Sequence, residues 1–71
     1  MAEERWRVVG ASGRVITCAI YYVSGPGVEV RVGYSVEEFL LTQRVADLST
    51  ARRVADGWRE GALATGVTEL S

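Results

Sequence analysis

The chain has 71 residues and a mass of 7.7 kDa, which is enough for one small domain, residues 1–71. Its eight basic residues, all arginine, and nine acidic residues give a net charge of -1, which excludes a surface that attracts nucleic acid by overall charge. Histidine is absent and cysteine occurs once, so the sequence offers no intrachain disulfide, no cysteine-based zinc site and no histidine general base.

Three segments in the first half of the chain have the composition of β-strands. Residues 14–23 are rich in β-branched and aromatic side chains, and residues 28–34 alternate between apolar and other side chains. Residues 5–10 form a shorter apolar run before the turn residues Ala11-Ser12-Gly13. Ser24-Gly25-Pro26-Gly27 predicts a second turn, because proline lacks a backbone donor and glycine permits positive φ.

Residues 39–45 are compatible with either a strand or a helical turn. We prefer a strand, because four short segments separated by turn signals form a meander. Phe39, Leu40 and Leu41 are consecutive and would place large apolar groups on both faces of a regular strand. A bulge is therefore expected at this point.

A helix is predicted from Ser49, a favourable N-cap residue, to a left-handed Gly66. At 100° per residue, one apolar stripe runs along it, formed by Ala51, Val54, Ala55, Trp58 and Ala62. Trp58 is the only large member, so we expect it to anchor the core. Arg52, Asp56 and Arg59 lie opposite, with the spacing of ion pairs along a solvated helix face.

These elements predict an α+β fold with two layers: a four-stranded antiparallel meander followed by one C-terminal helix (β-β-β-β-α). A helix about 10 Å wide covers only about half of one face of a sheet about 19 Å wide. The uncovered apolar surface and the short chain favour a homodimer. The alternative is a monomer whose aromatic side chains fold over the sheet edge.

Gly57 and Gly61 lie one turn apart on the predicted helix, where each costs about 1 kcal/mol relative to alanine. Such a flat strip suits a helix contact in a dimer or a tight helix–sheet crossing. The alternative is that the glycines are merely tolerated in a helix held by Trp58.

Five residues are expected on the sheet face opposite the helix: Arg7, Thr17, Tyr21, Arg31 and Arg44. Arginine and tyrosine on an open sheet can bind single-stranded DNA or RNA, with bases stacked on the ring and phosphates held by the guanidinium groups. The alternative is an ordinary polar sheet face. We identify no catalytic residues, no cofactor-binding residues and no metal ligands, because the serines have no histidine to activate them.

Motifs along most of the chain resemble those of a family of short bacterial proteins that has no assigned activity. They are Trp6-Arg7, Gly13-Arg14-Val15, Thr17-Cys18-Ala19-Ile20-Tyr21, Glu29-Val30-Arg31, Gly33-Tyr34-Ser35, Ala51-Arg52 and Trp58-Arg59. In topology alone, four strands followed by a helix are similar to one repeat of the Whirly and Pur-alpha single-strand-binding proteins.

We therefore expect a non-enzymatic bacterial module that acts through self-association and a macromolecular partner. The alternative function is single-stranded nucleic-acid binding through the outer sheet face. No signal peptide and no stretch of roughly 20 apolar residues is recognisable, so a cytoplasmic protein without membrane contact is expected. No small-molecule substrate is identifiable from the sequence.

Overall fold

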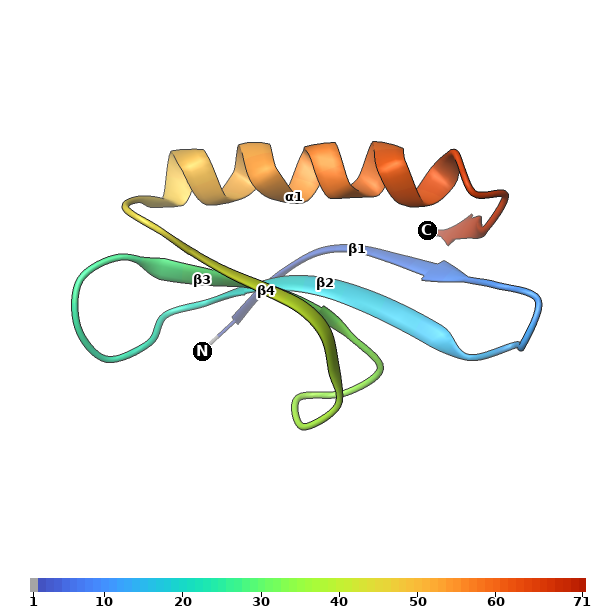
Figure 1. Ribbon diagram of the computed structural model, residues 1–71, viewed down its shortest axis with the longest axis horizontal. Coiled ribbons are helices and arrows are strands. Elements are labelled where there is room, and N and C mark those ends of the chain that lie inside the picture. The colour runs from blue at the N-terminus through green and yellow to red at the C-terminus, as the bar shows by residue number, and fades with distance from the viewer. Residues whose placement is uncertain (1) are drawn as a thin grey trace.

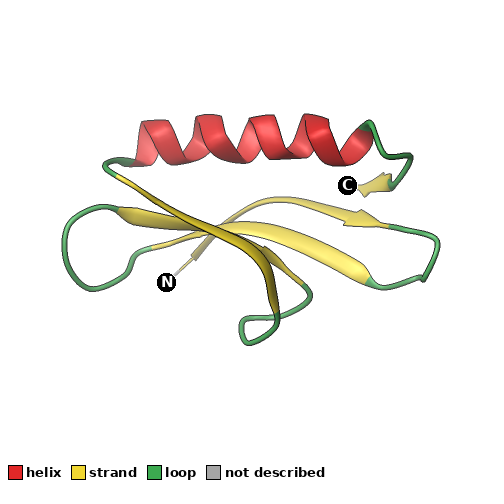
Figure 2. Ribbon diagram, in the orientation of Figure 1, coloured by secondary structure: helices red, strands yellow, loops and turns green. Residues whose placement is uncertain are grey.

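One helix lies across one face of an antiparallel sheet in the computed structural model, which describes residues 2–71 (Figures 1 and 2). This arrangement confirms the predicted α+β class. In chain order the elements are β1 (Ala2–Val9), β2 (Val15–Tyr21), β3 (Val28–Gly33), β4 (Phe39–Val45), α1 (Leu48–Leu63) and β5 (Thr68–Leu70). The sheet order is β4-β3-β2-β1-β5, so the first four strands form the expected meander.

The short strand β5 was not predicted. It pairs with the end of β1, where Val8 lies opposite Glu69. Gly66 makes the return of the chain feasible, because it has a φ of 93° and its amide donates to the carbonyl oxygen of Leu63. A three-residue strand carries too little pattern to be recognised without its partner strand.

The strand β4 is bulged at Leu40, as the three consecutive apolar residues indicated. Val32 pairs with Leu41 and Gly33 pairs with Phe39, which leaves Leu40 as the extra residue. The bulge allows Phe39 to lie on one face of the sheet while both leucines lie on the helix side. The strand alternative for residues 39–45 is therefore confirmed.

The core lies between the sheet and α1, but its central aromatic residue is Trp6 and not Trp58. Trp6 is 5% exposed, and its indole Nε1 donates to the carbonyl oxygen of Ala55, 2.8 Å away. Ala51 and Ala55 are fully buried, so their small side chains bring the helix close to the sheet. Trp58 is only half-buried at the edge of this core.

The helix begins two residues earlier than Ser49 suggested. Asp47 is the N-cap, and its Oδ1 accepts a hydrogen bond from the amide of Thr50 at 2.7 Å. This hydrogen bond lowers the pKa of Asp47. Leu48 thereby becomes the first helical residue and packs against the core, a contact that a helix capped at Ser49 would forgo.

The charged face of the helix is not simply solvated. Arg52 makes two hydrogen bonds of 2.9 Å to the carboxylate of Glu3 in β1, and Arg59 makes two to the carboxylate of Glu69 in β5. Asp56 lies 3.6 Å from Arg5. The expected pairs of Asp56 with Arg52 and Arg59 are therefore replaced by ion pairs that join the helix to the sheet.

Candidate interaction surfaces

The five residues expected on the outer sheet face do lie on the face opposite the helix. Strand pairing places Arg7, Thr17 and Gly33 in one row across the sheet, while Val8 in β1 and Cys18 in β2 point to the core. Further rows contain Arg31 opposite Ala19, and Tyr21 opposite Glu29 and then Arg44. All five side chains lie on this face, but only three of them line a common hollow.

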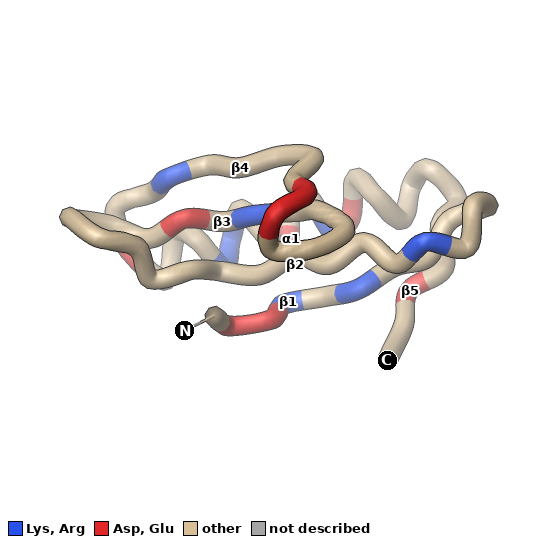
Figure 3. The backbone as a smooth tube through the Cα atoms, turned by 90° about the horizontal axis from the view of Figure 1, so that it is seen from below, with Lys and Arg blue, Asp and Glu red and all other residues tan. Residues whose placement is uncertain are grey.

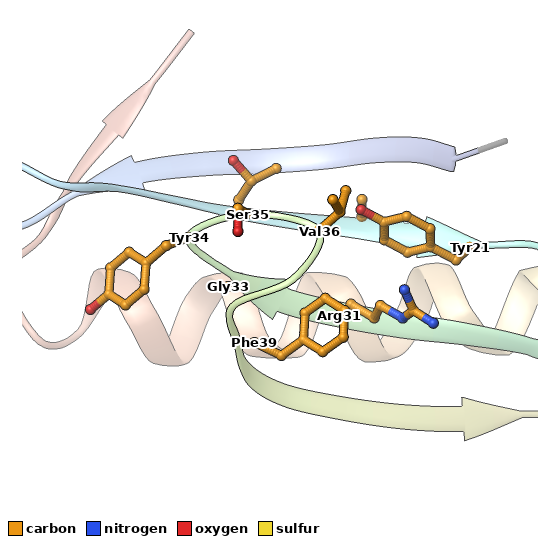
Figure 4. A pocket seen from close by; sticks show the side chains of 9 residues that line it. Tyr21, Arg31, Gly33, Tyr34, Ser35, Val36 and Phe39 are labelled. Carbon is orange, nitrogen blue, oxygen red and sulfur yellow. The ribbon is translucent and has the colours of Figure 1, made fainter.

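Thr17, Tyr21 and Arg31 line one hollow of about 180 Å³ (Figure 4). The Cζ of Arg31 lies 4.5 Å from the ring centre of Tyr21 and 4.7 Å from that of Phe39. We call these three side chains, Tyr21, Arg31 and Phe39, the outer cluster. Arg7 and Arg44 lie outside the hollow. Arg7 is 3.3 Å from Glu4, and Arg44 donates to the carbonyl oxygen of Pro26.

The loop that closes one side of this hollow was expected as a turn, but sequence reasoning did not assign its residues to a site. The remaining lining residues are Ala19, Gly33, Tyr34, Ser35, Val36 and Phe39. The amide of Tyr34 donates to the carbonyl oxygen of Glu38 at 2.9 Å, and Ser35 Oγ accepts from the amides of Glu37 and Glu38. Gly33 permits this loop, because a Cβ there would collide with the carbonyl oxygen of Glu38. Ser35 was the available signal, since serine commonly accepts hydrogen bonds from the next amides in a turn.

The arginines of the outer face are largely neutralised. Arg31 pairs with Glu29, and Arg14 pairs with Glu38 while its Cζ lies 3.7 Å from the ring centre of Tyr34. Acidic and basic segments accordingly lie next to each other along β3 and in the first part of β1 (Figure 3). Arg44 has no carboxylate within 4.0 Å among the described residues. This face can therefore offer aromatic stacking, but only a small excess of positive charge.

A second surface lies between β4 and the C-terminal half of the helix. Leu40 and Leu41, 54% and 47% exposed, face Gly57, Trp58 and Gly61 across a groove of about 440 Å³. Its remaining lining residues are Trp6, Val32 and Ala62. We call this surface the leucine groove. None of its lining residues is charged.

Gly57 and Gly61 form the open wall of the leucine groove. A Cβ built on either residue would meet nothing within 4 Å. The interpretation that they permit a tight helix–sheet crossing is therefore wrong, because no part of the sheet approaches them. Both glycines lie beside the exposed leucines, where there is room for a second molecule. A helix contact in a dimer therefore stays a prediction, because contacts within one chain do not test it.

Among residues 2–71, no group of three histidine, cysteine, aspartate or glutamate side chains is placed to hold a metal ion. Cys18 is fully buried, and burial raises the pKa of its thiol to about 12. Within the same described part of the chain, no helix has the length and apolar character to cross a membrane.

Comparisons of the chain with protein-family models, with curated proteins and with solved structures find no match.

Proposed function

We propose that this protein is a non-enzymatic interaction module whose principal action is to form a homodimer through the leucine groove. The observation that carries this proposal is the juxtaposition of two exposed leucines with an open, uncharged groove along the helix. Adjacent exposed apolar side chains of this kind characterise interaction sites on small proteins.

A second copy of the chain fits this surface because the surface is self-complementary. Leu40 and Leu41 protrude, while Gly57 and Gly61 leave a hollow one helix turn long beside them. In a two-fold dimer the same patch lies on both copies, so each copy can cover the other's exposed leucines. The uncharged lining removes the desolvation cost that charged side chains would add at such a contact.

The size of the chain supports the same occupant. A stable interface buries roughly 800 Å² per partner, which is about a fifth of the 4465 Å² accessible surface of this chain. Domains of this size bury a small fraction of their apolar surface and gain stability from oligomerisation. The described residues contain one free cysteine, so no disulfide supplies that stability here.

Sedimentation of the wild-type chain and of Leu41→Glu tests the proposal. The wild type should sediment with twice the mass of 7.7 kDa, and Leu41→Glu should sediment as a folded monomer. The matched control is Val36→Glu, which changes an apolar residue 61% exposed in the loop beside the other surface. A wild type that stays monomeric, or a Leu41→Glu variant that remains a dimer, would overturn the proposal.

A second candidate function is supported by the outer cluster. The exposed ring of Phe39 and the ring of Tyr21 flank one guanidinium group, which is the arrangement of a stacking platform for single-stranded nucleic acid. Because most arginines of this face are paired with carboxylates, such binding would depend on stacking more than on charge. Phe39→Leu should then weaken binding of a short oligonucleotide about tenfold.

The arginines provide a matched pair for the same experiment. Arg44 lies on the outer face and Arg53 on the helix, and neither has a carboxylate within 4.0 Å among the described residues. Arg44→Gln should weaken oligonucleotide binding, whereas Arg53→Gln should not. Equal effects, or no binding by the wild type at low salt, would remove this second candidate.

A further inference from the structure

We propose that the dimer forms edge to edge, with β4 pairing antiparallel to β4 of the second copy around a two-fold axis at Gln43. This inference rests on the proposed function and specifies which atoms meet. It predicts one continuous sheet across the dimer, with both helices on the same side.

β4 is the edge strand best suited to this pairing. It stands at one end of the sheet order, so one side of its backbone has no partner among the described residues. Beyond the bulge at Leu40, residues Leu41–Val45 pair regularly with β3, and they include one charged residue, Arg44. Unpaired backbone groups along such an edge are a template for another strand.

The opposite edge of the sheet is protected. β5 covers Arg7, Val8 and Val9, and the rest of β1 carries the charged residues Glu3, Glu4 and Arg5. β1 also has its own irregularity between Glu4 and Trp6. Charges and bulges at an edge oppose strand addition, so β4 is the edge left open.

Symmetry restricts the register. A two-fold axis perpendicular to the sheet keeps identical residues on the same face, and residues directly opposite each other in antiparallel strands also share a face. The axis must therefore lie midway between the two copies of one β4 residue, so that this residue is opposite itself in the partner strand. Within the regular segment, an axis at Gln43 is the one that uses all five residues Leu41–Val45.

The side chains agree with this axis. On the helix side, Leu41 would lie opposite the partner's Val45. Gln43 would lie opposite the partner's Gln43, and the NH2 group of one side-chain amide can donate to the carbonyl oxygen of the other. On the outer face, Thr42 would lie opposite the partner's Arg44. An axis at Arg44 would oppose two like charges, and an axis at Thr42 would set Leu41 against a glutamine.

The same axis closes the leucine groove. Leu41 faces the groove on the helix side of β4, and the groove opens beside this strand. In Figure 1, β4 crosses in front of the sheet and descends away from the C-terminal half of the helix. A second copy joined at β4 places its Val45 beside Leu41 and its helix on the same side of the common sheet, so Leu41 of both copies is covered in one contact.

Cross-linking measures the register directly. In a Cys18→Ala background, Gln43→Cys should form a disulfide-linked dimer in air, because directly opposed Cα atoms lie about 4.5–5.5 Å apart. Thr42→Cys is the matched control on the same strand. Its two copies would be diagonal neighbours about 7–8 Å apart and should cross-link far more slowly.

The outcomes separate this inference from the proposed function. A dimer by sedimentation in which Thr42→Cys cross-links as fast as Gln43→Cys, or in which neither does, would overturn the register and leave self-association standing. A monomer by sedimentation would overturn both.

Hydrogen exchange of the wild-type chain gives a measurement that needs no cysteine. Amides of Leu41–Val45 on the open edge should gain protection as protein concentration rises, while amides of the β1 edge at Glu3 and Glu4 should not. Unchanged exchange in β4 across the monomer–dimer transition would contradict edge pairing even if the cysteine variants fail to fold.

Discussion

At the scale of single residues, the two tryptophans differ in how deeply they are buried. Trp6 is packed inside the sheet–helix layer and satisfies its one donor on the carbonyl oxygen of Ala55. Trp58 lies on the apolar stripe of the helix, but its surroundings are half open because it lines the leucine groove. The same side-chain type thus supports the fold at one position and an interaction surface at the other.

Trp6→Ala should destabilise the chain by about 3–5 kcal/mol, because it leaves a cavity in the core. Trp58→Ala should cost clearly less, since part of its ring is already in contact with solvent. Urea denaturation at one low protein concentration measures both values. A larger loss for Trp58→Ala would show that the core is centred on the helix residue and not on Trp6.

Gly61 offers a prediction in which two properties change in opposite directions. Gly61→Ala should stabilise the isolated chain by up to about 1 kcal/mol, because alanine favours helix and the added Cβ meets nothing within 4 Å. It should also weaken the dimer, because the methyl group occupies the hollow. Thermal melts at low concentration and sedimentation at high concentration measure these effects. Stabilisation without weaker association would place the dimer contact elsewhere.

At the scale of elements, the helix is attached to the sheet at both ends by bidentate ion pairs. Arg52 reaches Glu3 near the first turn, and Arg59 reaches Glu69 near the last turns. The hydrogen bond and charge of Arg52, aided by Arg5, lower the pKa of Glu3 from 4.5 to about 2. Arg59 lowers the pKa of Glu69 in the same way.

These ion pairs predict a dependence of stability on pH. A carboxylate with a lowered pKa in the folded state stabilises the fold above its unfolded pKa, and this contribution disappears as pH falls toward the folded value. Unfolding should therefore become easier as pH decreases from 4.5 to about 2. Glu3→Gln should reduce this acid sensitivity, measured as the urea midpoint against pH. Glu37→Gln is the control, because Glu37 makes no ion pair among the described residues. Equal acid sensitivity in wild type and Glu3→Gln would contradict the role of this pair.

At the scale of the whole molecule, the two faces of the sheet have different characters. The helix covers the core face, while the outer face carries the Tyr21–Arg31–Phe39 cluster between paired charges. The leucine groove lies between β4 and the C-terminal half of the helix. A dimer joined at β4 would leave both outer clusters accessible on one side of a common sheet, so self-association and ligand binding do not compete for the same surface.

Unfolding coupled to dissociation makes the melting temperature depend on concentration. The melting temperature of the wild type should rise as the protein is concentrated, because the dimer is favoured. Leu41→Glu should melt at one temperature at all concentrations. A concentration-independent melt of the wild type would contradict a dimer that contributes to stability.

Local patterns in the sequence were sufficient for the class of fold and for most of its elements. The alternation of Val28, Val30 and Val32 and the apolar helix stripe depend only on the geometry of single strands and helices, and the buried positions follow them. The three consecutive apolar residues of β4 similarly indicated a bulge, although the bulged strand still carries Phe39 on one face and both leucines on the other. The turns followed from glycine and proline in the same way.

Where the sequence contains two equivalent local signals, such as two N-cap residues or two possible ion pairs, tertiary contacts decide which one is used. Asp47 and Ser49 are both good N-caps, and Asp47 was selected because Leu48 packs on the core. β5 exists because β1 offers it a partner, and Arg52 and Arg59 choose carboxylates on neighbouring strands over Asp56 in their own helix. The leucine groove is likewise a property of packing. Leu40 and Gly61 are far apart in the chain, and they line one groove only because the fold places β4 beside the C-terminal half of the helix.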